Sequence, residues 1–148
     1  MMEEQEHLMQ YRRDGFYCSQ IIMLEGLNQM GKSNPDLIRA MQALANGLTH
    51  NDELCGALSG GACLLGLYAG KGTAAENEDP RLIIMVEELV TWFKSEYGQP
   101  FGGIRCDQIL AGNRQNMMTR CPLMVSGVLQ KTNEILVENG FDLYGIEE

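Results

Sequence analysis

Cysteine is too scarce in this sequence to hold the fold together through disulfides. The chain has 148 residues and five cysteines, whereas small disulfide-stapled scaffolds contain roughly 8–10% cysteine. Five is also an odd number, so a complete set of internal disulfides is impossible. A chain of this length can bury a sufficient apolar core without bridges. We therefore expect one domain over residues 1–148.

Positive charge is scarce as well. The chain has 11 Lys and Arg against 20 Asp and Glu, which gives a formal net charge of −9. The only basic doublet is Arg12–Arg13. An acidic surface repels nucleic-acid phosphates and anionic membrane surfaces. The sequence therefore argues against nucleic acid as a partner and against docking on a membrane.

Long hydrophobic runs are missing too. The uncharged stretch at residues 54–70 (LCGALSGGACLLGLYAG) is at the lower limit of a membrane span and is rich in Gly and Ala. We predict a buried helix there and no membrane span. The acidic start MMEEQEH does not resemble a secretory signal peptide. We expect a cytoplasmic protein, whose thiols stay mostly reduced, and a frayed N-terminus over residues 1–10.

Helical periodicity is what the sequence has in abundance. Apolar residues recur at helical spacing, and no segment sustains the alternation of a strand. Asn34–Pro35 and Asp79–Pro80 are helix start signals. We predict an all-α, single-domain bundle of about five or six helices. They are expected over residues 14–31, 35–46, 54–70, 80–98, 104–111 and 121–139.

Small residues form a stripe along the predicted helix at 54–70. A glycine inside a helix costs about 1 kcal/mol relative to alanine, so a repeated glycine suggests that something approaches the helix closely. One interpretation is a tight crossing with another helix. The other is that Gly56 and Gly60 contact a bound cofactor.

The cysteines form no local motif. There is no C-x-x-C and no C-x-x-C-H, so a shared site must be assembled from distant segments. Four cysteines fall within about a turn of a predicted helix start, where the helix dipole favours a thiolate. We expect Arg105 and Arg120 to lower the pKa of the neighbouring thiols further. These four are Cys18, Cys55, Cys106 and Cys121, whereas Cys63 is expected to be an inert buried thiol in mid-helix.

The order of these four cysteines resembles a known family. Cys55 opens the block CGALSG, of the form CGAxxG. Cys18 precedes it in GFYCSQ, and Cys106 (RCDQIL) and Cys121 (TRCP) follow it. This pattern is similar to that of the C_GCAxxG_C_C family of small, single-domain, redox-active proteins, over most of the chain. The resemblance implies a redox role for these four cysteines. It does not include Cys63 and names no substrate.

Two forms of redox chemistry stay open at this point. The thiols could cycle through disulfides, with one cysteine attacking and a second resolving the mixed disulfide. Alternatively, Cys18, Cys55, Cys106 and Cys121 could be metal ligands, because four thiolates are the usual ligand set of an iron–sulfur cluster and of structural zinc. Either form needs a redox partner protein, which the sequence does not identify. The protein could be an oxidoreductase or an electron carrier, and a homodimer is compatible with both.

Two further hypotheses belong to other classes. The chain could be a non-enzymatic structural or interaction protein whose thiols are merely buried. The segment from Gly26 to Ser33 (GLNQMGKS) also matches the nucleotide-binding pattern G-x-x-x-x-G-K-[ST]. That motif functions only between a strand and a helix, whereas the segment here follows a predicted helix, so we treat nucleotide binding as a minor alternative.

Overall fold

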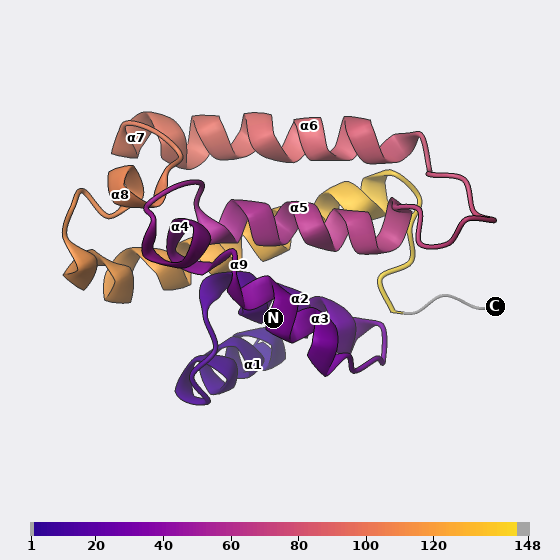
Figure 1. The fold of residues 1–148 in the computed structure, drawn as a ribbon, viewed down its shortest axis with the longest axis horizontal. Helices are drawn as coiled ribbons and strands as arrows, with labels where there is room; N and C mark the ends of the chain where they lie inside the picture. The colour runs from indigo at the N-terminus through magenta and orange to yellow at the C-terminus, as the bar shows by residue number, and fades with distance from the viewer. Residues whose placement is uncertain (1, 145–148) are drawn as a thin grey trace.

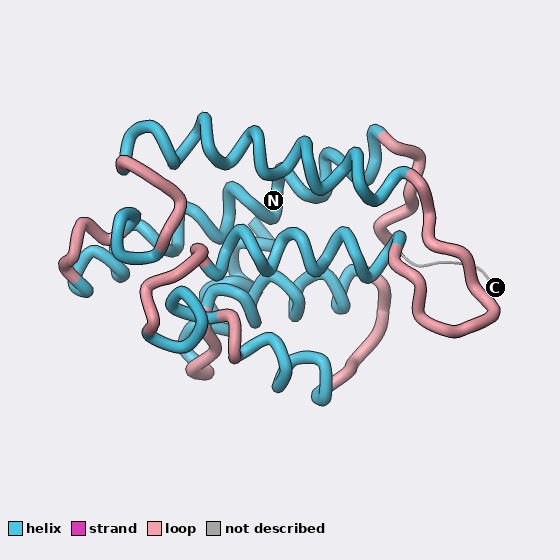
Figure 2. The backbone as a smooth tube through the Cα atoms, turned by 45° about the horizontal axis from the view of Figure 1, so that its top comes forward, coloured by secondary structure: helices cyan, strands magenta, loops and turns pink. Residues whose placement is uncertain are grey.

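The structure, a computed structural model, describes residues 2–144 and is all-α over that range. Figure 1 shows the arrangement of its elements, and Figure 2 shows the helices as cyan tube joined by loops. The elements are α1 (Met2–Arg13), α2 (Cys18–Gln29), α3 (Pro35–Gln42), α4 (Ala45–His50), α5 (Gly56–Ala69), α6 (Arg81–Phe93), the π-helix η1 (Lys94–Gly98), α7 (Gln99–Phe101), α8 (Cys106–Ile109), the 3₁₀ turn η2 (Arg114–Asn116) and α9 (Met117–Glu138). The all-α prediction is confirmed.

Helix α5 is the centre of the fold. It packs against α2 on one side and against α6 and α9 on the other (Figure 1). Its sequence is almost entirely apolar, which suits a helix that is covered on most of its surface. No helix within residues 2–144 is long and apolar enough to cross a membrane. The side chains that fill the core around α5 are fully buried and include Ile21, Ile22, Leu64, Leu65, Met85, Leu89, Phe93, Val128, Leu129 and Ile135.

The N-terminal segment, for which we expected a frayed terminus over residues 1–10, forms α1 from Met2 to Arg13; residue 1 lies outside the described range. Helix α1 has two acidic residues in its first turn and Arg12 and Arg13 in its last, and both placements favour the helix dipole. Leu8 is buried against the core. His7 lies 3.1 Å from a carboxylate oxygen of the buried Glu25 in α2. These contacts fix α1 on the bundle.

Two helix starts differ from the prediction. Helix α2 begins at Cys18 rather than Asp14, because Gly15 has a φ of 95° and turns the chain between α1 and α2. Helix α9 begins at Met117 rather than Cys121. Pro122 is therefore inside α9, where it removes one backbone donor from the helix. Cys121 is the fifth residue of α9 and does not lie at its start.

The segment before Cys55 is a left-handed turn that the sequence did not predict. We expected the preceding helix to end at Asn46–Gly47, but α3 already ends at Gln42. From Asn46 to Thr49 every φ is positive, between 54° and 66°. This conformation costs roughly 1–2 kcal/mol per non-glycine residue. The Thr49 hydroxyl donates to the Ala43 carbonyl over 3.1 Å and helps to hold the turn.

Candidate functional site

Backbone pairing brings two of the cysteines together. Leu54 and Arg105 form an isolated antiparallel bridge. On either side of it, the Cys55 N–H donates to the Ile104 carbonyl over 3.0 Å, and the Cys106 N–H donates to the Glu53 carbonyl over 2.6 Å. Diagonal neighbours on one face of an antiparallel pair lie within reach of each other. Cys55 and Cys106 have this relationship, and both are 6% exposed.

The side chain of Cys18, from helix α2, lies close to Cys55 as well. Its Sγ lies 2.7 Å from the position that a Cβ on Gly56 would occupy. Gly56 directly follows Cys55, the N-cap residue of α5. A side chain at Gly56 would therefore displace the Cys18 sulfur, and its absence lets the start of α2 approach the start of α5.

Charge interactions connect the remaining cysteine to this group. A thiolate at Cys18 or at Cys106 raises the pKa of Cys121, and a thiolate at Cys18 or Cys121 raises that of Cys55. Such effects need groups that lie close together. The structure thus gathers Cys18, Cys55, Cys106 and Cys121 from four separate elements. No disulfide joins them in the described chain.

Burial favours the protonated form of three of the thiols, those of Cys18, Cys55 and Cys121. Burial is the main cause that raises the pKa of Cys18, Cys55 and Cys121 above the usual 9.0, and the pKa of Cys121 reaches about 12. Backbone N–H groups of Asn46 and Ser19 lower the pKa of Cys18 but do not outweigh burial. The expectation that helix starts would lower these pKa values was therefore wrong, because desolvation of the thiolate is the larger effect.

A cation beside the cysteines is Arg12, which stands out in the sequence only as half of a basic doublet. Its charge lowers the pKa of both Cys18 and Cys121. Arg105 pairs instead with Asp107 over 3.2 Å. Arg120 donates to the Ile109 carbonyl and lies over the Phe101 ring. Arg120 is therefore not among the groups that lower the pKa of Cys121, contrary to the prediction. The doublet was the signal that could have identified Arg12.

Tyr97 is a second neighbour that the sequence did not reveal. It lies in the π-helix η1, an element often found at functional sites. Burial, then the charges of Glu96 and Cys55, raise the pKa of its phenol. Its hydroxyl occupies the space that a side chain at Gly127 would need. Tyr97 therefore lies beside the cysteine group, and its side chain packs from η1 against Gly127 of α9.

The small-residue stripe of α5 is explained largely by helix crossing. A Cβ on Gly60 would lie 3.1 Å from the Ser19 Cα and 3.3 Å from its carbonyl oxygen. The close neighbours of Gly56 and Gly60 are thus α2 and the Cys18 sulfur, and contact of these glycines with a cofactor stays a prediction. Cys63 on the same helix is exposed, so the expectation of a buried thiol there was wrong.

Thiols are suitable metal ligands by residue type, but the positions of these four in the described structure do not form a metal site. Four thiolates are the usual ligands of zinc and of iron–sulfur clusters. Within residues 2–144, however, no three His, Cys, Asp or Glu side chains are placed to hold a metal ion. The sulfurs would have to move closer together to become ligands.

The segment from Gly26 to Ser33 does not form a phosphate-binding loop. Its first four residues belong to the last turn of α2, and Gly31 has a φ of 73° just after that helix. The strand that must lead into such a loop is replaced by a helix. Nucleotide binding through this motif therefore lacks its structural basis.

These observations define an all-α protein in which four cysteines, remote in sequence, meet at the starts of α2, α5 and α8 and in the second turn of α9. The chain belongs to the C_GCAxxG_C_C family, whose model carries the description "Putative redox-active protein" and matches residues 16–135. All four cysteines lie inside the match, whereas Arg12 precedes it. Comparisons with curated proteins and with solved structures found no significant match.

Proposed function

We propose that the protein is a thiol–disulfide redox protein whose primary pair is Cys18 and Cys55. One observation supports this pairing above all: the Cys18 sulfur occupies the space that a side chain on Gly56, the residue after Cys55, would need. The charge of a Cys18 thiolate also raises the pKa of Cys55. Joining the two sulfurs removes this repulsion, because a disulfide carries no charge.

Cys18 is the attacking thiol in this proposal. It is more exposed than Cys55, which is 6% exposed. Nearby backbone N–H groups and Arg12 also counteract part of the rise in its pKa. Its thiolate attacks a disulfide of a partner protein and forms a mixed disulfide. Cys55 then attacks the Cys18 sulfur, so the chain gains a disulfide and the partner leaves as a dithiol, having taken up two electrons and two protons.

The raised pKa values set the direction of electron flow. A redox protein whose thiolate is strongly stabilised is an oxidant, because its reduced form is favoured. Here burial destabilises the thiolates. We therefore infer that the reduced protein is an electron donor towards its partner. Cys106 and Cys121 are the second pair, since each lies close enough to share the same charge network.

Anaerobic purification followed by metal analysis and thiol titration tests this function. We expect a colourless protein without stoichiometric iron or zinc. We expect two more titratable thiols after reduction than after oxidation by a disulfide if only the Cys18–Cys55 pair reacts, and four more if the second pair reacts as well. An iron-dependent visible spectrum that disappears in the Cys18→Ser and Cys55→Ser variants would contradict the disulfide mechanism and support the cluster. Unchanged thiol counts in both redox states, with no metal, would support a non-enzymatic protein with buried thiols.

A further inference from the structure

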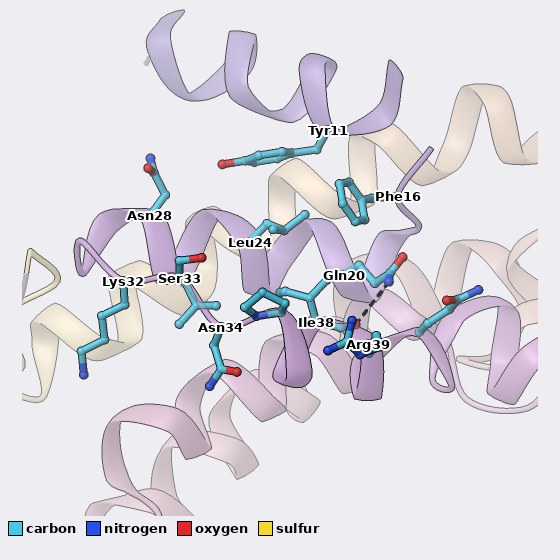
Figure 3. A pocket seen from close by; sticks show the side chains of 13 residues that line it. Tyr11, Phe16, Gln20, Leu24, Asn28, Lys32, Ser33, Asn34, Ile38 and Arg39 are labelled. Carbon is cyan, nitrogen blue, oxygen red and sulfur yellow. Dashed lines mark hydrogen bonds between the residues drawn. The ribbon is translucent and has the colours of Figure 1, made fainter. Parts of the chain in front are cut away.

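A large cavity lies on the other side of α2 from α5. It has a volume of about 530 Å³ and is lined by side chains of α1, α2, α3 and the segments that join them (Figure 3). This size is in the range of about 300–1,000 Å³ that is usual for small-molecule sites. The cavity is distinct from the cysteine group, because none of the five cysteines lines it.

The walls of the cavity are mainly apolar. Tyr11 of α1 and Phe16 of the following turn face Leu24 of α2 and Ile38 of α3 across it (Figure 3). The Tyr11 hydroxyl donates to the buried Glu25 carboxylate over 3.3 Å, so the polar end of this side chain is already bonded. The aromatic ring of Tyr11, rather than its hydroxyl, is therefore the surface that this residue offers to a ligand.

The side-chain amide of Gln20, on the wall of the cavity, already forms hydrogen bonds within the protein. Gln20 is 5% exposed. Its amide nitrogen donates to the Ile38 carbonyl over 3.2 Å, and its amide oxygen accepts from the Tyr17 N–H over 3.1 Å. A ligand in the cavity therefore meets aromatic and aliphatic surface rather than a free hydrogen-bonding group at this point.

The charged residues of the lining are both positive. They are Lys32 and Arg39, and the described lining contains no carboxylate, although the chain carries a net charge of −9. Arg39 is paired with Asp36. For Lys32 the described structure records no ion pair. In Figure 3 Asn28, Lys32 and Ser33 all lie at one end of the cavity, where the Lys32 side chain extends along the rim away from Asn28 and Tyr11. The positive charge therefore stands at the rim of that end, beside two hydrogen-bonding side chains.

From this arrangement we infer that the cavity binds a small organic anion with a hydrophobic body, such as an aliphatic or aromatic carboxylate. The body lies between Tyr11, Phe16 and Leu24, and the carboxylate lies towards Lys32. Burial of apolar surface supplies most of the affinity, and the lysine selects the sign of the head group. This inference is independent of the proposed redox function.

A titration of the full-length protein with decanoate, followed by amide NMR shifts, tests the inference. We expect saturable 1:1 binding, with shifts confined to α1, α2, α3 and their connections. Lys32→Met retains the aliphatic stem and should weaken binding about three- to fivefold, the size of a single exposed charge interaction. Lys71→Met removes a lysine from an exposed loop outside the cavity and should leave the affinity unchanged.

The cation decyltrimethylammonium has the same tail and the opposite charge. We expect it to bind at least about threefold more weakly than decanoate, for the same reason. Equal binding of the two amphiphiles would overturn the inference. So would an absence of saturable binding, shifts centred on other helices, or an equal loss of affinity in the two lysine variants.

Discussion

The sulfur of Cys18 stands 2.7 Å from the point where a side chain on Gly56 would begin. A glycine at this position is what allows two cysteines, one from α2 and one from the start of α5, to share a site. The same Cβ would lie 3.0 Å from the Leu44 carbonyl oxygen. The chain therefore has little freedom to accommodate any larger residue there.

Gly56→Ala should destabilise the protein and disturb the cysteine pair. We expect a loss of about 1–3 kcal/mol in the free energy of unfolding, typical of overpacking, together with slower oxidation of the Cys18 and Cys55 thiols. Urea denaturation and thiol counting measure the two effects. Gly66→Ala in the same helix is the matched control. A Cβ there has no neighbour within 4 Å, so it should gain up to about 1 kcal/mol from helix propensity. A neutral Gly56→Ala variant would contradict the close approach.

The pH dependence of stability should report the buried thiols. The folded pKa of Cys121 is about 12, above the usual 9.0. The native state therefore holds its proton more tightly than the unfolded state does. The resulting stability is fully present below pH 9 and is lost as the pH rises towards 12. Each such thiol should steepen the decline by at most about 1.4 kcal/mol per pH unit.

Reduced wild-type protein and its Cys121→Ser variant should therefore differ above pH 9. We expect a shallower loss of unfolding free energy in the variant between about pH 9 and 11, measured by urea denaturation under argon. The raised pKa values of Tyr11 and Tyr68 contribute equally to both proteins, so the difference isolates the thiol. Parallel curves would show that Cys121 is not buried among other thiols.

Arg12→Met should make the site less reactive. Arg12 is the positive charge that lowers the pKa of Cys18 and Cys121. Its loss should slow alkylation of these two thiols at pH 8 by about two- to threefold, as for an exposed charge interaction. Peptide mass spectrometry after timed iodoacetamide labelling measures this. Arg13→Met is the control, because Arg13 donates to Gln10 and does not affect these pKa values. Equal slowing in both variants would show that only the net charge matters.

The left-handed turn before Cys55 can be tested by whether a glycine substitution raises or lowers the free energy of unfolding. Leu48 has a φ of 63° and is 47% exposed. Leu48→Gly should therefore stabilise the protein by about 0.5–1 kcal/mol, since glycine removes the backbone strain and little burial is lost. Leu123→Gly changes a leucine that is still more exposed, at 71%, in right-handed α9. It should instead destabilise by about 1 kcal/mol. Destabilisation by both substitutions would contradict the left-handed conformation.

The helix content could be predicted from the sequence because it rests on local signals. The apolar run at 54–70 became α5, and the start signal at Asn34–Pro35 became the N-cap and first residue of α3. Cys106 lies in the first turn of a short helix as expected, although that helix spans Cys106–Ile109 rather than 104–111. Periodicity, capping residues and proline position act within a few residues of where they are read.

Features set by the tertiary structure could not be predicted in this way. The pKa of Cys55 depends on burial and on Cys18, neither of which is a local property. The helical N-terminus depends on Leu8 packing into the core and on His7 meeting Glu25. Pro122 was interpreted as a helix start, whereas α9 tolerates it in its second turn. The strained turn has only Asn46–Gly47 as a signal, because Leu48 and Thr49 disfavour a positive φ.

The proposed redox function requires that Cys18 and Cys55 form a reversible disulfide. The most direct test is non-reducing peptide mapping of the Cys63→Ser protein after equilibration across a series of glutathione ratios. This background removes the exposed thiol and leaves the other four. We expect a Cys18–Cys55 linked peptide that appears in a single two-electron transition and disappears on reduction. Oxidised protein in which Cys18 and Cys55 remain unlinked to each other would contradict it.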